Sequence, residues 1–323
     1  MGRITTSLAS ALSAVPLLFS QVLGAPTDVN HVTQRWENPI ADGWYADPDG
    51  LRFGDEYWVY ATVSISFDDQ TYFDAFSSPD LVHWTPHPKV FAADNSNWAE
   101  KWFWAPCTIE RNGKYYFFYT ANNPIANEGN AGIGVAVADT PAGPFNDLID
   151  RPIVDRHYNG GNAMDQQVFI DDDGKYYLIW GGSRVNISPL SEDMKSIEDW
   201  ADGSGPKDIT PNEGFGEGSF MLKHNGKYYF MWSEGPYGEP DYRVAYAMSD
   251  SLTGPFDRIG LILSTTDVAD GPGHHSVFKD HDGKYYIVYH RRIIGDNVAD
   301  HRIIAIDRFY FNEDGTIKPV VMT

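Results

Sequence analysis

Five stretches of the chain alternate apolar or aromatic residues with polar ones on both sides of a short turn signal. Such alternation is typical of β-strands, and Asn-Gly or Asp-Gly between two strands predicts a hairpin, because these residues tolerate the positive φ of a two-residue turn. In the first stretch, Gly54-Asp55 takes the place of that dipeptide. The five predicted hairpins are LRFGDEYWVYAT (51–62), CTIERNGKYYFFYTA (107–121), VFIDDDGKYYLIWGG (168–182), SFMLKHNGKYYFMWSEG (219–235) and SVFKDHDGKYYIVYH (276–290).

The hairpins recur at a nearly constant interval. Their turn positions are Asp55, Gly113, Gly174, Gly226 and Gly283. These positions are 58, 61, 52 and 57 residues apart, a period typical of repeat architectures. Between hairpins a second element recurs, an alternating strand followed by a turn and an aromatic residue, as in AFSSPDLVHW (75–84) and VAVADTPAGPF (135–145).

Two strands per hairpin and about two more in each second element give four strands per unit. Five such units without a strong helical period favour an all-β, five-bladed β-propeller, in which radial repetition protects the sheet edges. A β-sandwich is the alternative, but it needs no self-similarity of this length. We therefore expect residues 26–323 to form a single propeller domain.

A position ahead of each hairpin carries a different residue in each copy. It lies nine residues before the turn glycine in units two to five, and eight residues before Asp55 in unit one. The first strand of each propeller blade lines the central channel, so equivalent positions form a ring at one depth. We expect one funnel to be lined by Asp47, Trp104, Asp165, Glu217 and His274.

Three residues of this predicted ring are carboxylates. Like charges in one pocket raise at least one pKa, which costs stability and indicates function. In inverting glycoside hydrolysis a protonated carboxyl donates to the leaving oxygen, while an ionised one about 6.5 to 9.5 Å away activates water. Asp has the lower reference pKa, so Asp47 is the predicted base. Glu217, flanked by Phe215 and Phe220, is the predicted acid, because apolar neighbours raise its pKa. The charge of Asp165 helps to keep that acid protonated.

The segments around these residues resemble the blade motifs of glycoside hydrolase family 43, in order and spacing, over the whole of residues 26–323. GKYY alone marks only a hairpin, but five motifs in one order are specific. The motifs are WYADPDG (44–50), FWAPCTIERNGKYYFFYTA (103–121), MDQQVFIDDDGKYYLIWGG (164–182), EGSFMLKHNGKYYFMW (217–232) and GPGHHSVF (271–278).

The resemblance implies a five-bladed propeller that hydrolyses arabinose- or xylose-containing glycans with inversion. It assigns Asp47 as general base, Asp165 as the residue that tunes and orients the acid, and Glu217 as general acid. It further implies that Arg302, in the last outer strand, reaches the pocket. His274 would lie below the substrate and hold calcium or another cation, directly or through water. No organic cofactor is expected.

Two departures from the family pattern affect this assignment. The motif Glu-Gly-Ser replaces the more common Glu-Gly-Pro, which changes the backbone beside Glu217. His274 is followed by His275, and neighbouring residues of a strand point to opposite faces, so only one of the two rings is expected to face the channel. Trp104 is expected to stack on a sugar ring or to form a wall of the pocket.

The first 25 residues have the pattern of a secretory signal peptide. Arg3 gives a positive start, an uncharged apolar stretch covers residues 8–23, and two small residues follow. A membrane anchor is the alternative, but Ser and Pro interrupt a run that is shorter than the roughly 20 residues a span needs. We therefore expect a secreted protein.

Charge and composition narrow the range of partners. A net charge of −21 without a local Lys/Arg cluster argues against nucleic acid and anionic membranes. An oligo- or polysaccharide is the expected partner. The single Cys107 cannot form an intramolecular disulfide. Asn186-Ile187-Ser188 is an N-glycosylation sequence, which suggests a surface position. The run 171–173 is expected to be a turn, since it lacks the spaced ligands of a calcium loop.

The sequence thus predicts a secreted, inverting exo-glycosidase acting on xylosyl or arabinofuranosyl linkages of plant cell-wall polysaccharide, as a β-xylosidase, an α-L-arabinofuranosidase or both. Segments 97–103 and 122–130 are candidates for closing one end of the pocket. An endo-1,5-α-L-arabinanase with an open groove is the nearest alternative. Three further alternatives are a retaining fructoside-cleaving propeller, a phosphorolytic propeller and a non-catalytic glycan-binding propeller.

Overall fold

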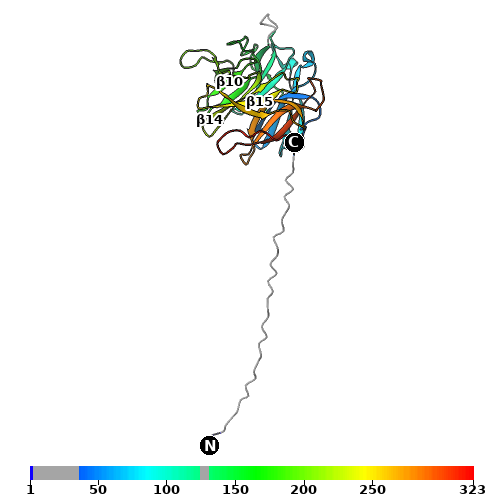
Figure 1. Cartoon of the computed structure of the whole chain (residues 1–323), viewed down its shortest axis with the longest axis vertical. Coiled ribbons are helices and arrows are strands. Elements are labelled where there is room, and N and C mark those ends of the chain that lie inside the picture. The colour runs from blue at the N-terminus through cyan, green and yellow to red at the C-terminus, as the bar shows by residue number, and fades with distance from the viewer. Residues whose placement is uncertain (3–35, 124–130) are drawn as a thin grey trace. The chain divides into compact units, whose positions relative to one another are not determined.

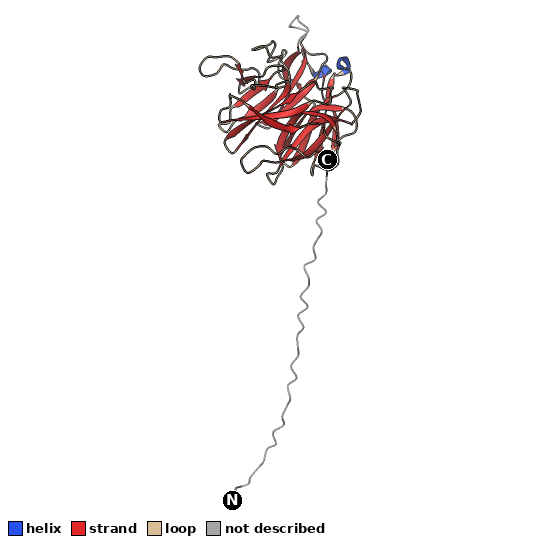
Figure 2. Ribbon diagram, viewed as in Figure 1, coloured by secondary structure: helices blue, strands red, loops and turns tan. Residues whose placement is uncertain are grey.

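The predicted repeats form five antiparallel sheets in the computed structural model, which describes residues 1–2, 36–123 and 131–323 (Figures 1 and 2). Residues 35–323 make up one unit and residues 1–34 another. The five-bladed β-propeller is therefore confirmed for the larger unit. Apart from residues 1 and 2, the predicted signal peptide lies outside the described residues. The described part of the chain contains no helix long and apolar enough to span a membrane.

Four blades have four strands each among the described residues. Blade 1 consists of β1 (Tyr45–Phe53), β2 (Glu56–Val63), β3 (Tyr72–Ser78) and β4 (Thr85–Ala92). Blade 2 consists of β5 (Trp104–Arg111), β6 (Lys114–Asn122), β7 (Ala131–Ala138) and β8 (Asn146–Asp147). Blade 3 consists of β9 (Gln167–Ile170), β10 (Tyr176–Trp180), β11 (Asn186–Pro189) and β12 (Lys207–Asp208). Blade 4 consists of β13 (Glu217–His224), β14 (Lys227–Glu234), β15 (Arg243–Ser249) and β16 (Arg258–Leu263).

Blade 5 has three strands, where the repeat predicted four. They are β17 (Asp270–Lys279), β18 (Tyr285–Arg292) and β19 (Arg302–Phe309). The outer edge of β19 is instead covered by the segment that precedes β1. The backbone N–H of Ile40 donates to the carbonyl oxygen of Ile304 over 3.1 Å, and the Asn38 side chain accepts from the N–H of Ile306 over 2.8 Å. The two ends of the repeat array thus close the ring, which protects the last sheet edge.

The first strand of each blade lies innermost. Each of β1, β5, β9, β13 and β17 contacts the first strand of the next blade, and β17 contacts β1 again. Two short 3-10 helices, η1 (Phe67–Asp69) and η2 (Ala93–Asn95), lie in connections of blades 1 and 2. The apolar faces of neighbouring blades pack on each other, with fully buried aromatic side chains such as Trp180 and Trp232 between them.

The hairpin turns are of two kinds, which corrects the prediction of five equal turns. Blades 1, 2 and 4 have the two-residue turns, as at Asn112-Gly113, where Arg111 pairs with Lys114. In blade 3, Ile170 pairs with Tyr176, so residues 171–175 form a five-residue loop, and blade 5 has a loop of the same length. The acidic run 171–173 lies in this loop, as expected, and the Asp171 carboxylate pairs with Lys223 over 2.5 Å.

Asn186 does not lie on the surface, and the prediction from its glycosylation sequence is wrong. Its side chain is fully buried, and its amide nitrogen donates to the carbonyl oxygen of Tyr158 over 3.0 Å. The amide oxygen accepts from Asn159 over 2.8 Å. Cys107 is buried and unpaired, and its Sγ accepts from the N–H of Val168 over 3.2 Å.

Candidate active site

A residue in the left-handed backbone region interrupts the start of the innermost strand, or lies just ahead of it, in each blade. These residues are Asp47 (φ 50°), Ala105 (φ 46°), Asp165 (φ 55°), Gly218 (φ 62°) and His274 (φ 41°). In blades 1, 2, 4 and 5 the strand pairing slips by one residue at this place, which is the pattern of a β-bulge. Positive φ in non-glycine residues costs about 1–3 kcal/mol and is concentrated at functional sites.

The five predicted ring residues occupy two neighbouring positions, not one. Asp47, Asp165 and His274 are themselves the left-handed residues, whereas Trp104 and Glu217 come one residue before Ala105 and Gly218. Counting back from the turn glycine mixed the two positions, because the turns in blades 3 and 5 are longer. All five side chains nevertheless line one pocket.

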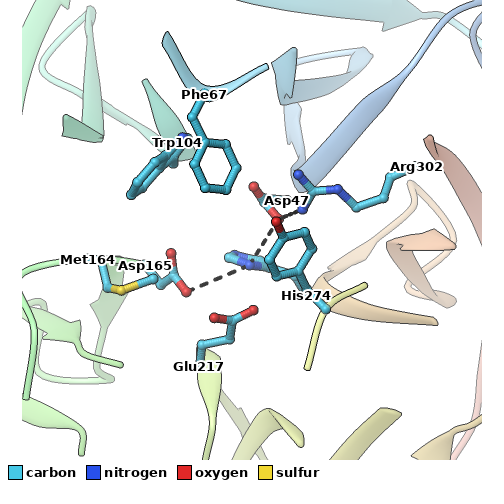
Figure 3. A pocket seen from close by; sticks show the side chains of 9 residues that line it. Asp47, Phe67, Trp104, Met164, Asp165, Glu217, His274 and Arg302 are labelled. Atoms are coloured by element: carbon cyan, nitrogen blue, oxygen red, sulfur yellow. Dashed lines mark hydrogen bonds and ion pairs between the residues drawn. The ribbon is translucent and has the colours of Figure 1, made fainter. Parts of the chain in front are cut away.

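This pocket has a volume of about 210 Å³ and lies where the innermost strands converge (Figure 3). It is smaller than the roughly 300–1,000 Å³ of sites for drug-sized ligands, which favours a single sugar ring. Arg302 also lines it, as predicted. Phe67, Met164 and Tyr237 complete the lining and were not predicted. No lining residue comes from segment 97–103, and residues 124–130 of the other proposed wall lie outside the described residues.

Asp47 is surrounded by cationic and imidazole groups. Its Oδ1 lies 3.3 Å from Nδ1 of His274, 3.3 Å from Nδ1 of His290 and 3.3 Å from an Arg302 guanidinium nitrogen. Burial alone would raise the pKa of Asp47, but the charges of His274 and Arg302 outweigh it and hold that pKa well below its ordinary value. The Asp47 carboxyl is therefore ionised at neutral pH.

Asp165 and Glu217 have the opposite shift. Burial, followed by the charges of Glu217 and Asp47, raises the pKa of Asp165 well above its ordinary value. Burial also raises the pKa of Glu217, and the Asp47 charge adds to this effect, while His274, the Tyr242 hydroxyl and Arg302 oppose it. The Asp165 carboxylate accepts from the N–H of Gly218 over 3.2 Å, which connects it to the residue next to Glu217.

His274, and not His275, is the ring that faces the pocket. Its Nδ1 lies between Oδ1 of Asp47 and Oδ2 of Asp165, at 3.3 Å and 3.9 Å. The His275 ring is buried against Phe220, and burial lowers its pKa to about 3. Neither ring nitrogen of His275 has a hydrogen-bond partner among the described residues.

Aromatic rings form one side of the pocket. Phe67, on η1, packs against Trp104 with ring centroids 5.4 Å apart, and the Trp104 indole N–H donates to the buried side chain of Gln70. Tyr237, in the connection after β14, lies over the Arg302 guanidinium at 4.9 Å. Arg302 also donates to Ser64 over 3.0 Å, so its orientation is fixed from two sides.

Two buried residues behind the pocket were also missed. Tyr242 donates from its hydroxyl to Oε1 of Glu217 over 2.8 Å, and His290 accepts from the N–H of Asp47 over 3.1 Å. His290 is a polar residue at the end of the apolar run YYIVYH, a signal that could have drawn attention to it. Tyr242 has no such signal, because Tyr is common in the strands of this chain.

One ionised carboxyl and two carboxyls of raised pKa in a pocket with an aromatic wall provide a base and an acid together. Environments that push the pKa values of neighbouring groups apart are the usual basis of acid and base roles. Among the described residues, no group of three or more His, Cys, Asp or Glu side chains is placed to hold a metal ion.

Comparisons with known proteins identify the family to which the chain is similar. The family described as "Glycosyl hydrolases family 43" matches residues 36–317. The chain is 42% identical over 302 residues to beta-D-galactofuranosidase xynD of Aspergillus niger, covering 88% of this chain and 85% of that protein. A thermostable family-43 glycoside hydrolase superimposes with a TM-score of 0.78 at 30% identity, covering 90% and 96% of the two chains. CoXyl43, a beta-xylosidase/alpha-arabinofuranosidase from a compost microbial metagenome, superimposes with a TM-score of 0.74 at 26% identity. The match covers 88% of this chain and 96% of that chain.

Proposed function

The chain belongs to glycosyl hydrolase family 43, an inverting family of glycoside hydrolases, and on that premise we propose that it is an exo-acting enzyme that removes terminal xylosyl or arabinofuranosyl residues. Its substrate is a carbohydrate. The observation that carries the proposal is the pairing, in one small pocket, of an ionised Asp47 with a Glu217 of raised pKa.

The proposed catalytic roles follow from these opposite pKa shifts. Asp47 takes a proton from a water molecule, whose oxygen attacks the anomeric carbon. Glu217 gives its proton to the glycosidic oxygen as the bond to that carbon breaks. The sugar is released with inverted configuration, and Glu217 and Asp47 return to their starting states by exchanging protons with water. Asp165 is assigned the role of favouring the protonated form of Glu217, since two neighbouring carboxyls do not readily ionise together, while Arg302 and His274 keep Asp47 ionised.

The shape of the pocket supports exo-action. Its small volume fits a single sugar ring, and Phe67 and Trp104 offer an apolar face on which such a ring can stack. An endo-1,5-α-L-arabinanase would need a groove that continues on both sides of Asp47 and Glu217. The xylosyl and arabinofuranosyl assignment draws on the resemblance of the motifs and on the name of the compost enzyme CoXyl43.

A galactofuranosyl linkage is the second candidate, because the Aspergillus niger relative with 42% identity is named a beta-D-galactofuranosidase. A galactofuranosyl ring carries a two-carbon side arm where an arabinofuranosyl ring carries one carbon. Discrimination by one such group in a pocket is worth only about 1–3 kcal/mol. The same catalytic pair can serve both sugars, and the part of the pocket that meets the side arm decides between them.

The test is a panel of 4-nitrophenyl β-D-xylopyranoside, α-L-arabinofuranoside and β-D-galactofuranoside, with debranched arabinan as an endo-substrate. We expect release of nitrophenol from at least one glycoside, loss of that activity in Glu217→Ala, and an inverted anomer by proton NMR. Oligosaccharides released from arabinan faster than any nitrophenol would favour the endo-arabinanase. Sugar binding without hydrolysis, unchanged in Glu217→Ala, would establish the glycan-binding alternative.

Two further features complete the proposal. The pattern of residues 1–25 supports secretion, since it has the charged start, apolar stretch and small residues of a signal peptide. A cation near His274 stays a prediction from the family resemblance. The side chains around His274 do not by themselves supply a metal-binding set among the described residues, so we assign no catalytic step to a metal.

A further inference from the structure

Tyr242 contacts the proposed proton donor directly, from behind the pocket. It is fully buried, it immediately precedes β15, and it is absent from the pocket lining. Its hydroxyl donates to Oε1 of Glu217 over 2.8 Å. Tyr242 therefore acts on the Glu217 carboxyl without touching the substrate.

A chain of donors sets the direction of this hydrogen bond. The backbone N–H of His274 donates to Oγ of Ser233 over 2.9 Å. The Ser233 side chain is fully buried, and its hydroxyl lies beside that of Tyr242, whose pKa it lowers as a donor to the phenol oxygen does. Since Ser233 accepts from a backbone N–H, which can only donate, its own proton is free to point at Tyr242. The single Tyr242 proton is then directed to Glu217.

Packing holds the Tyr242 ring in one place. The ring is parallel to that of the fully buried His290, with centroids 5.5 Å apart and an angle of 1° between the planes. Its edge lies against the backbone of Gly273, where a methyl group would overlap the ring. Closely packed side chains of this kind occupy a single rotamer. The hydroxyl therefore has a fixed position relative to Glu217.

A protonated carboxyl has one oxygen that carries the proton and one that only accepts. We propose that Tyr242 is a positioning residue for the general acid: its hydroxyl reserves Oε1 of Glu217 as the acceptor, so that the acidic proton resides on Oε2. This inference rests on the proposed role of Glu217 as proton donor. It assigns to Tyr242 both the orientation of the carboxyl and the choice of the oxygen that delivers the proton.

The Tyr242→Phe variant removes only the hydroxyl and tests this role. We compare it with wild type on glycosides of one sugar whose leaving groups range from 2,4-dinitrophenol, which needs no protonation, to a second sugar, which does. General acid catalysis is worth about 100- to 10,000-fold. Misplacing the proton should lower kcat roughly 10-fold or more for the sugar leaving group and hardly at all for dinitrophenol, with KM nearly unchanged.

Tyr229→Phe is the matched control. Tyr229 is also buried in blade 4 and donates over 2.6 Å to the carbonyl oxygen of Gly315, far along the chain from the site. A structural loss would affect all leaving groups equally, so an equal loss in Tyr242→Phe, or no loss, would overturn the inference. Ser233→Ala, which removes the preceding donor, should show the same dependence on leaving group to a smaller degree.

Crystal structures of wild type and Tyr242→Phe make the test independent of activity. We expect the Glu217 carboxyl to rotate or to become disordered in the variant. An unmoved carboxyl would overturn the positioning role. If wild type cleaved no glycoside of the panel, the proposed function would fail, but the two crystal structures would still decide whether Tyr242 positions Glu217.

Discussion

The imidazole of His290 supports the backbone of Asp47: its Nδ1 accepts the Asp47 N–H over 3.1 Å. A ring nitrogen that accepts from a backbone N–H carries no proton, so the proton of the neutral ring lies on Nε2. Burial keeps the ring neutral, since it lowers the pKa of His290 to about 4. Asp47 is in the left-handed region at φ 50°, and this hydrogen bond is one of the contacts that hold it there.

Replacing His290 should therefore impair the base. His290→Phe keeps a planar ring but leaves the buried N–H of Asp47 without an acceptor, which costs about 1–3 kcal/mol of stability. We expect kcat to fall roughly 10-fold or more, by the same factor for all leaving groups, because water activation is needed for each of them. Steady-state kinetics and urea unfolding measure the two effects.

The His290→Asn variant is the control, because its amide oxygen can accept in place of Nδ1. It should recover part of both the stability and kcat. Full activity in His290→Phe would show that Asp47 keeps its position without this hydrogen bond.

Asp165 should set the upper limit of the active pH range. The enzyme needs Glu217 protonated, so activity falls as pH rises through the Glu217 pKa. Asp165 and Glu217 influence each other: the Glu217 charge contributes to the raised pKa of Asp165, and an ionised Asp165 favours the protonated form of Glu217 in the same way. In Asp165→Asn that charge is absent, the Glu217 pKa drops, and the alkaline limb of kcat/KM should move to lower pH by about one unit.

The acidic limb provides the internal control for this variant. It reports the ionisation of Asp47, whose pKa is held low by His274 and Arg302, two residues that remain in place. An alkaline limb of the kcat/KM profile that stayed at the wild-type pH, or moved to higher pH, would contradict the role assigned to Asp165.

The aromatic wall should affect binding more than chemistry. Phe67 lines the pocket, yet 42% of it is exposed, so its removal costs the fold little. Phe67→Ala should raise KM several-fold, in line with roughly 1 kcal/mol for one aromatic contact, with kcat close to wild type. Ile259, 48% exposed and absent from the pocket lining, is a matched control, and Ile259→Ala should leave both constants unchanged. A fall in kcat without a change in KM would contradict a role of Phe67 in binding.

The repeat made the fold and the ring of site residues predictable from the sequence. Turn dipeptides predict hairpins because the backbone of a tight turn requires particular residues, and a constant period predicts repeated units that stack on one another. Both signals can be recognised in the sequence alone. The count back from each turn succeeded even though blade 3 has a five-residue loop, because that position and its neighbour both point into the pocket. The glycosylation sequence at Asn186 wrongly predicted a surface position, since a three-residue pattern carries no information on burial.

The pocket residues that lie in connections between strands could not be predicted from the sequence. Phe67 and Tyr237 lie in connections between strands, and such segments follow no period that could be read across blades. Tyr242 contacts Glu217 only because the bulge in β13 and the bare backbone at Gly273 leave room for its ring. Contacts of this kind depend on tertiary packing, which a repeat pattern does not encode.

The buried ring of His275 should make the protein less stable in mild acid. Burial, with a smaller effect from the neighbouring His274, lowers the pKa of His275 from 6.5 to about 3. As pH falls below 6.5 the unfolded chain binds a proton that the folded protein does not. The stability that depends on the neutral ring is thus complete above pH 6.5 and is lost as pH falls towards 3, by about 1.4 kcal/mol per pH unit.

His275→Leu, which cannot bind a proton in either state, should show a correspondingly shallower fall in unfolding free energy between pH 6 and pH 4 in urea titrations. Contributions from Asp165 and Glu217 have the opposite sign but are common to both proteins, so they largely cancel in the comparison. The exposed His157 is the control, and His157→Leu should leave the slope as in wild type. Parallel curves for wild type and His275→Leu would mean that the folded protein accommodates a charged ring at this position.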